Sequence, residues 1–66
     1  MTDREAEKQA AEKTAREIWA TFDDNERYGV RFGMFPAEKM KPADALGREG
    51  SHAVVVALMG MTRMIA

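Results

Sequence analysis

The chain has one histidine, His52, and it directly follows Ser51, so this pair is the one place where a hydroxyl nucleophile adjoins an imidazole base. Neighbouring residues at the start of a helix point in different directions, and no G-x-S-x-G motif surrounds the serine. Glu49 lies close before His52, but a lone histidine near a helix start is usually a surface residue. The sequence also contains no phosphate-binding loop and no dinucleotide fingerprint. We therefore expect no enzymatic activity.

The acidic run Asp23-Asp24-Asn25-Glu26 resembles the start of a calcium-binding loop. An EF-hand loop needs oxygen ligands at its first, third and fifth positions and glycine at the sixth. If Asp23 is the first position, Arg27 and Tyr28 fall at the fifth and sixth, so the motif fails. One histidine and no cysteine cannot build a structural zinc site. We expect no metal and no other cofactor.

Basic and aromatic side chains concentrate between residues 25 and 40. Arginine and aromatic residues carry much of the binding energy at protein interfaces. The candidate partner-binding residues are Arg27, Arg31, Phe35 and Lys39. A solvated basic edge is the alternative for Arg27 and Arg31. Whether the four residues share one face depends on whether residues 28–35 form a helix or a strand.

A first helix is predicted over residues 2–22. Thr2 and Glu5 have the spacing of a capping box, and no glycine or proline interrupts the chain before Phe22. Apolar residues repeat at helical spacing at Ala11, Ala15, Ile18, Trp19 and Phe22. Since the first two turns offer only alanine as an apolar contact, we expect residues 1 to about 8 to fray or to project from the body.

Two structures compete for the central stretch. Asp23 and Glu26 form a second capping box, which predicts a helix over residues 24–32 that ends at Gly33. The alternation of Tyr28, Val30, Phe32 and Met34 instead predicts a strand near 28–35, which would pair with 53–59. A two-stranded sheet is only marginally stable, so the helix is favoured. In that helix, Gly29 and Gly33 would allow close packing against the first or last helix.

Two prolines, Pro36 and Pro42, predict a short, kinked helical segment over residues 36–46. Gly47 and Gly50 are expected to end it in a loop, and Ser51 is a good N-cap for a last helix over 51–65. This last segment is apolar on almost every side and rich in methionine, so it is either a buried central helix or half of an interface. At about 22 Å it is too short to cross a bilayer core of about 30 Å.

These elements predict an all-α fold, a small bundle of three to four helices in a single domain over residues 1–66; the alternative is an α+β fold with the two strands named above. A chain of 66 residues buries only about 60% of its unfolded surface, so its stability margin is thin. With no cysteine for disulfides, association with a larger protein or with further copies is the remaining way to stabilise it.

The net charge and the N-terminal residues indicate which partners and which cellular location to expect. The net charge of −1 argues against bulk binding of nucleic acid or an anionic membrane, and no small-molecule substrate is evident. The charged N-terminal residues lack the apolar run of a signal peptide. We therefore expect a cytoplasmic protein.

The run N-E-x-x-G-V-R-F-G-x-F-P-A-x-K-M, at residues 25–40, resembles short uncharacterised proteins encoded by bacteriophages and prophages. The resemblance extends over roughly residues 23–60. It implies no activity and no site residues, but it does imply a small phage accessory protein that binds a host or phage macromolecule.

The sequence thus favours a non-enzymatic protein that binds a larger protein, such as an inhibitor of host machinery of the anti-CRISPR kind. One alternative is a transcriptional regulator of helix-turn-helix type. Its recognition helix would follow Ser51, where Arg63 is the one basic residue, although base reading needs several polar or basic side chains. Another alternative is a structural subunit that assembles through the last helix.

Overall fold

The computed structural model describes residues 3–63, which form helices and turns and contain no strand. The elements in chain order are α1 (Asp3–Thr21), α2 (Asp24–Val30), the 3-10 helix η1 (Ala37–Met40), α3 (Lys41–Asp44) and α4 (Gly47–Thr62). The predicted all-α fold is confirmed. The alternative strands near 28–35 and 53–59 are wrong, because residues 28–35 form the end of α2 and the turn after it and residues 53–59 lie inside α4.

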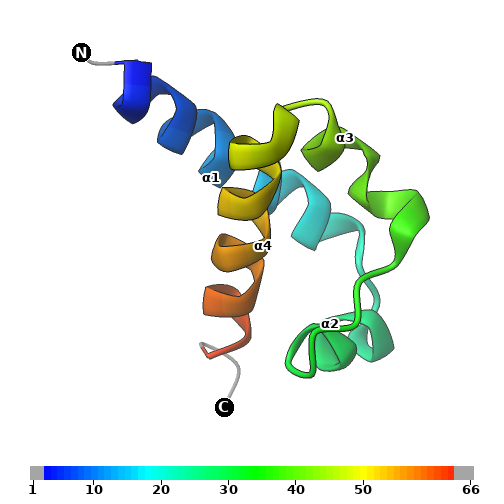
Figure 1. Ribbon diagram of the computed structural model, residues 1–66. Coiled ribbons are helices and arrows are strands. Elements are labelled where there is room, and N and C mark those ends of the chain that lie inside the picture. Colours follow the sequence, from blue (N-terminus) through cyan, green and yellow to red (C-terminus); the bar gives the residue numbers. More distant parts are fainter. Residues whose placement is uncertain (1–2, 64–66) are drawn as a thin grey trace.

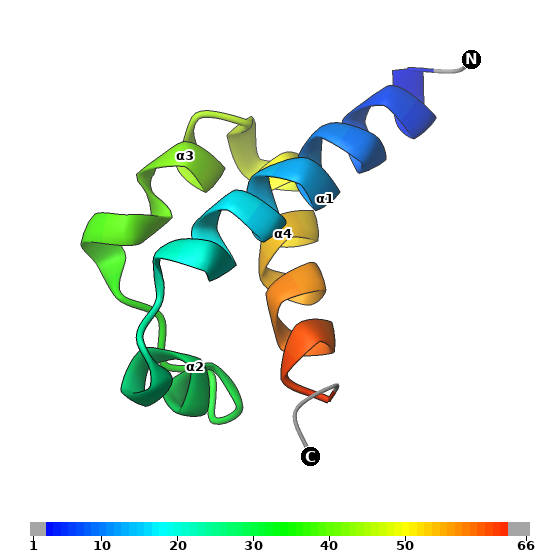
Figure 2. The ribbon, with the colours of Figure 1, turned by 180° about the vertical axis from the view of Figure 1, so that it is seen from behind.

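The core forms where α1 and α4 cross (Figure 1). The largest fully buried side chains come from three helices: Ile18, Val30, Val54 and Leu58. Seen from behind, α2 and α3 lie on the same side of the crossing, and both contact α4 (Figure 2). Burial of these apolar side chains supplies most of the free energy that holds the short elements in place.

Helix α1 follows the predicted helix 2–22 closely, and its apolar stripe is buried at Ala11, Ala15 and Ile18. Every residue from Asp3 to Ala10 is exposed, and this part of α1 projects beyond the body (Figure 1). The predicted cap at Thr2 lies outside the described residues. The overhang is therefore helical without cover from the rest of the chain.

Helix α2 has the predicted local signals at both ends. The Asp23 carboxylate accepts a hydrogen bond from the Glu26 N–H, and the Glu26 carboxylate accepts one from the Asp23 N–H, which is a complete capping box. At the other end Gly33 has φ +77°, and hydrogen bonds run from its N–H to the Val30 carbonyl and from the Met34 N–H to the Gly29 carbonyl. This pair of bonds is the Schellman motif, which needs a left-handed residue that glycine adopts without strain.

The prediction that Gly29 and Gly33 allow close helix packing is wrong. A methyl group on Gly29 would touch only Met34, and one on Gly33 would have no neighbour within 4 Å. Gly33 serves the left-handed turn rather than an interhelical contact.

The segment after Pro36 is more broken than the predicted helix over 36–46. Four residues form η1, and α3 follows with Pro42 in its first turn, where the missing N–H costs nothing. Met40 and Ala43 point into the core from this segment. The segment therefore covers one side of the α1–α4 crossing.

The start of the last helix was wrongly predicted. Helix α4 begins at Gly47, Gly50 lies inside it, and Ser51 is therefore not its N-cap. Gly47 has φ +81°, which lets the chain reverse from α3 into α4. A methyl group on Gly50 would lie 2.5 Å from the Leu46 Cβ, so glycine fits there because the turn before it is tight.

Helix α4 buries Val54, Leu58 and Thr62 but leaves Val56 and Met59 exposed, so it is neither wholly core nor wholly surface. Residues 64 and 65, the end of the predicted helix, lie outside the described residues. Within residues 3–63, no helix combines the length and the hydropathy that crossing a membrane requires.

Candidate partner-binding site

Two of the four predicted site residues, Arg27 and Lys39, converge on the C-terminal end of α1. The Arg27 Nη2 donates a hydrogen bond to the Trp19 carbonyl at 3.2 Å, and the Lys39 Nζ donates one to the Thr21 carbonyl at 2.8 Å. The last turn of α1 has no basic residue of its own. Cations near the C-terminal end of a helix stabilise its unpaired carbonyls and its dipole. Arg27 and Lys39 thus supply this charge from α2 and η1.

The Arg27 guanidinium also stacks on the indole ring of Trp19, 5.2 Å from the ring centroid. Trp19 is half-buried and packs against the core, so this cation–π contact lies at the edge of the core rather than in open solvent. The Arg27 side chain is itself half-buried. A partner protein would meet only part of it.

Lys39 makes a second contact, an ion pair with Glu26 in which Nζ and Oε1 lie 2.5 Å apart. Two hydrogen bonds lower the pKa of the Glu26 carboxyl below its ordinary value. The one from Lys39 has the larger effect, and the one from the Asp23 backbone N–H has the smaller. Glu26 therefore caps α2 and anchors Lys39 at the same time. We call Glu26, Lys39 and the Thr21 carbonyl the Lys39 clamp, because they join α1, α2 and η1.

Arg31 lies apart from that pair, directly after the C-terminal end of α2. Its Nη2 approaches the Thr62 carbonyl at 3.5 Å, in the last turn of α4, which has no basic residue. The Arg31 side chain is exposed. Its position relative to α4 parallels that of Arg27 and Lys39 relative to α1.

Phe35, the fourth predicted residue, is half-buried and packs against the core. The four residues therefore do not form one open face. Arg27 and Lys39 lie at the end of α1, and Arg31 lies at the end of α4. Phe35 packs against the core. Arg27, Phe35 and Lys39 are half-buried and offer a partner only part of their side chains, whereas Arg31 is exposed.

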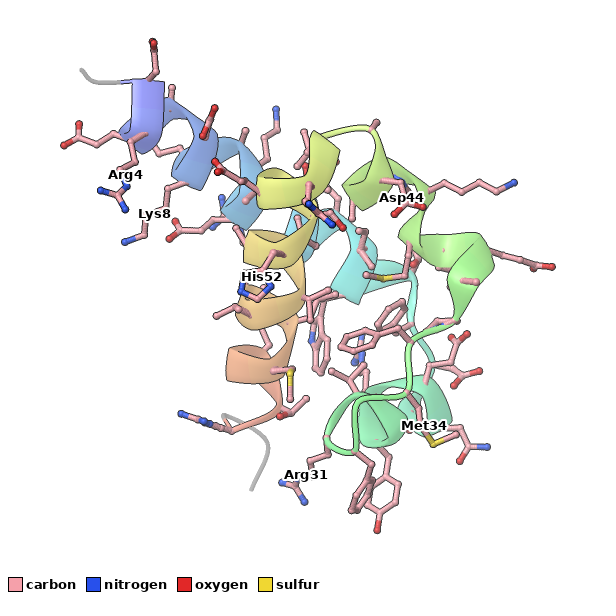
Figure 3. The ribbon with its side chains drawn as sticks, viewed as in Figure 1. Arg4, Lys8, Arg31, Met34, Asp44 and His52 are labelled. Carbon is pink, nitrogen blue, oxygen red and sulfur yellow. The ribbon has the colours of Figure 1, made fainter. Side chains whose placement is uncertain are left out.

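A more open surface lies beside them, made by Tyr28, Phe32 and Met34, and we call these three residues the aromatic surface. They are exposed by 62%, 65% and 68%, respectively. The Tyr28 and Phe32 rings meet edge-on with centroids 5.3 Å apart. Figure 3 shows Met34 and Arg31 at the end of the molecule formed by α2, pointing away from each other.

A shallow hollow of about 500 Å³ adjoins the aromatic surface. Phe35 and Pro36 line it together with the three residues of that surface, so the predicted residue Phe35 contributes to the wall. At roughly 150–250 Å² per large side chain, the three exposed residues present about 400 Å² of mostly apolar surface. Contiguous patches of this size on small proteins often mark interaction sites.

The alternation of Tyr28, Val30, Phe32 and Met34 is the sequence signal that marks this surface. On a strand all four side chains would share one face. On α2 and the turn after it, only Val30 is buried, and the other three point outward. The capping box and Gly33 are the sequence features that favour the helix over the strand.

Ser51 and His52, the adjacent hydroxyl and imidazole, lie elsewhere. His52 is exposed on α4 and points away from the body (Figure 3), and Ser51 beside it is half-buried within the helix. Across residues 3–63, no three histidine or acidic side chains gather closely enough to hold a metal ion.

Comparison with protein-family models, curated proteins and solved structures finds no match to this chain.

Proposed function

We propose that this chain is a non-enzymatic binding protein whose aromatic surface docks on a larger protein. The observation that carries the proposal is the exposure of Tyr28, Phe32 and Met34, each more than three-fifths open to solvent, in one patch. Leaving large apolar side chains in water costs free energy that a partner recovers by covering them. Aromatic side chains at the centre of an interface contribute most to its affinity.

The local structure supports a preformed site. Tyr28 stands on α2, whose N-terminal end is fixed by the capping box, and Met34 follows the Schellman turn at Gly33. The Lys39 clamp holds α2 against α1. A surface fixed in this way loses little conformational entropy when it binds.

The resemblance to phage-encoded proteins favours a bacterial host protein as the partner, and inhibition of that partner as the outcome. The cytoplasm is then the place of action. DNA binding is less well supported, because the exposed side chains of α4 include Val56 and Met59 rather than a row of base-reading groups.

The test compares Phe32→Ser with Val56→Ser, which makes a similar apolar-to-polar change at a residue of similar exposure, 56%, on α4. Each immobilised variant, shown to be folded by circular dichroism, is exposed to bacterial host lysate, and the bound proteins are quantified by mass spectrometry. We expect at least one host protein to be recovered about tenfold less with Phe32→Ser, because the centre of the docking surface is lost.

Val56→Ser should recover that protein as the wild type does. If no captured protein depends on Phe32, or if both variants lose the same proteins equally, the aromatic surface is not the docking site.

A further inference from the structure

A second surface lies in the angle between α1 and α4, well away from the aromatic surface in the chain. It is an open hollow of about 480 Å³. Its apolar wall is formed by Ala11 of α1 and by Ala53, Val56 and Ala57 of α4. Charged residues of both helices make its rim: Arg4, Glu7, Lys8, Glu12 and Glu49. We call this hollow the α1–α4 groove.

The helical stripe that α1 buries in the core continues into the groove. Residues Ala11, Ala15 and Ile18 are buried, and Arg4 and Lys8 extend the same spacing by two more turns. Figure 3 shows Arg4 and Lys8 together on one side of the projecting end of α1. The core face of α1 is thus longer than the part that α4 covers.

The projecting part of α1, from Asp3 to Ala10, is exposed at every residue. Isolated helices shorter than about 12–15 residues are marginal in water, so this overhang would gain from a packed neighbour. Val56, opposite it on α4, is 56% exposed. Both walls of the groove therefore have surface to bury.

We infer that the α1–α4 groove receives the α1 helix of a second copy of this chain, in antiparallel orientation, so that two chains form a symmetric dimer. The charges that two such helices bring together are complementary. Along the groove face of α1 the charges alternate in sign: Arg4, Glu7, Lys8 and Glu12. In an antiparallel pair with the two-fold axis between Glu7 and Lys8, each Lys8 faces Glu7 of the second copy.

The same register brings Arg4 of the second copy beside Glu12. Glu49 of α4 also lines the groove, so Arg4 of the second copy meets two carboxylates there, while its aliphatic stem can cover Val56. A parallel pair would instead set each charge against its own kind and align the two helix dipoles unfavourably. The sequence of charges thus selects a second copy in one orientation.

The dimer should be weak and sensitive to salt. The groove involves only one end of α1 and one face of α4, whereas a standard interface buries roughly 800 Å² on each partner. Its ion pairs lie at the rim, where salt screens them within a Debye length of about 10 Å at 0.1 M. This inference is independent of the proposed function, because the two use different residues.

Sedimentation velocity tests the dimer, with the full chain at concentrations from micromolar to millimolar in low and high salt. At low salt the wild type should move from the monomer mass of 7.4 kDa toward twice that mass as concentration rises. Lys8→Glu should weaken association by at least about tenfold, because it turns two attractive contacts per dimer into repulsive ones.

Lys13→Glu is the matched control, since it makes the same charge change on the same helix but outside the groove, and it should leave association unchanged. The double variant Glu7→Lys with Lys8→Glu should restore the dimer, because it exchanges the signs of each pair. A wild type that stays monomeric at low salt, or a dimer that survives Lys8→Glu, overturns the inference.

Phe32→Ser distinguishes dimer formation from the proposed binding of a host protein. It should abolish capture of the host protein and leave the dimer intact. Loss of both properties together in this variant would contradict the separate use of the two surfaces.

Discussion

At the scale of single residues, the cations of the central stretch act first within the chain. Arg27 and Lys39 bind carbonyls of Trp19 and Thr21 and so complete the end of α1. Lys39 also pairs with Glu26, which caps α2. A residue type that suggests a binding surface in the sequence is here used for helix capping between elements.

The Lys39 clamp predicts a specific pH dependence. Its hydrogen bonds lower the pKa of Glu26 in the folded state, so Glu26 stabilises the fold above its unfolded pKa and this contribution is lost as pH falls through the folded pKa. Between about pH 5 and pH 3, the thermal midpoint of the wild type should therefore fall more steeply than that of Glu26→Gln.

Glutamine keeps the cap to the Asp23 N–H but cannot ionise, so the two melting curves should converge in acid. Glu38→Gln, which removes an exposed carboxylate next to Lys39, is the control and should follow the wild type. Parallel pH profiles for the wild type and Glu26→Gln would show that the clamp adds no stability through its charge.

At the scale of elements, α2 depends on the Schellman turn that ends it. Gly33 has φ +77° and no neighbour near its Cβ position, so alanine there is opposed by backbone strain alone. Gly33→Ala should lower the free energy of unfolding by about 1–2 kcal/mol, as measured by urea denaturation.

Gly60→Ala is the matched control, because Gly60 is helical in α4 and a methyl group added to it would also have no neighbour within 4 Å. Alanine there should raise the free energy of unfolding by about 0.5–1 kcal/mol. Changes of the same sign in both variants would contradict the role assigned to the left-handed turn.

At the scale of the whole molecule, stability rests on one small core at the α1–α4 crossing. At about 0.05–0.15 kcal/mol per residue, a chain of 66 residues has a free energy of unfolding of about 3–10 kcal/mol. Leu58 is fully buried in this core. Leu58→Ala should cost about 2–5 kcal/mol and leave much of the protein unfolded at 37 °C, as followed by thermal melting.

Met59→Ala changes the next residue of the same helix, which is 40% exposed, and should shift the thermal midpoint far less. If the two substitutions have equal effects, α4 is not packed through the Leu58 face.

Local signals in the sequence determined the helical fold and several element ends. The capping box at Asp23 and Glu26, the turn at Gly33 and the apolar stripe of α1 involve residues at most a few positions apart, so neighbouring side chains suffice to specify them. These signals also favoured the helix over the strand near residues 28–35. The phage resemblance and the proposed partner remain predictions.

Tertiary structure decided the rest, because it depends on contacts between residues far apart in the chain. Lys39 reaches Thr21 and Arg31 reaches Thr62, and no local pattern indicates either contact. The early start of α4 follows from the tight turn in which Gly50 faces Leu46. Only packing around Val30 turned Tyr28, Phe32 and Met34 outward, and so moved the most open candidate surface from the predicted cations to their apolar neighbours.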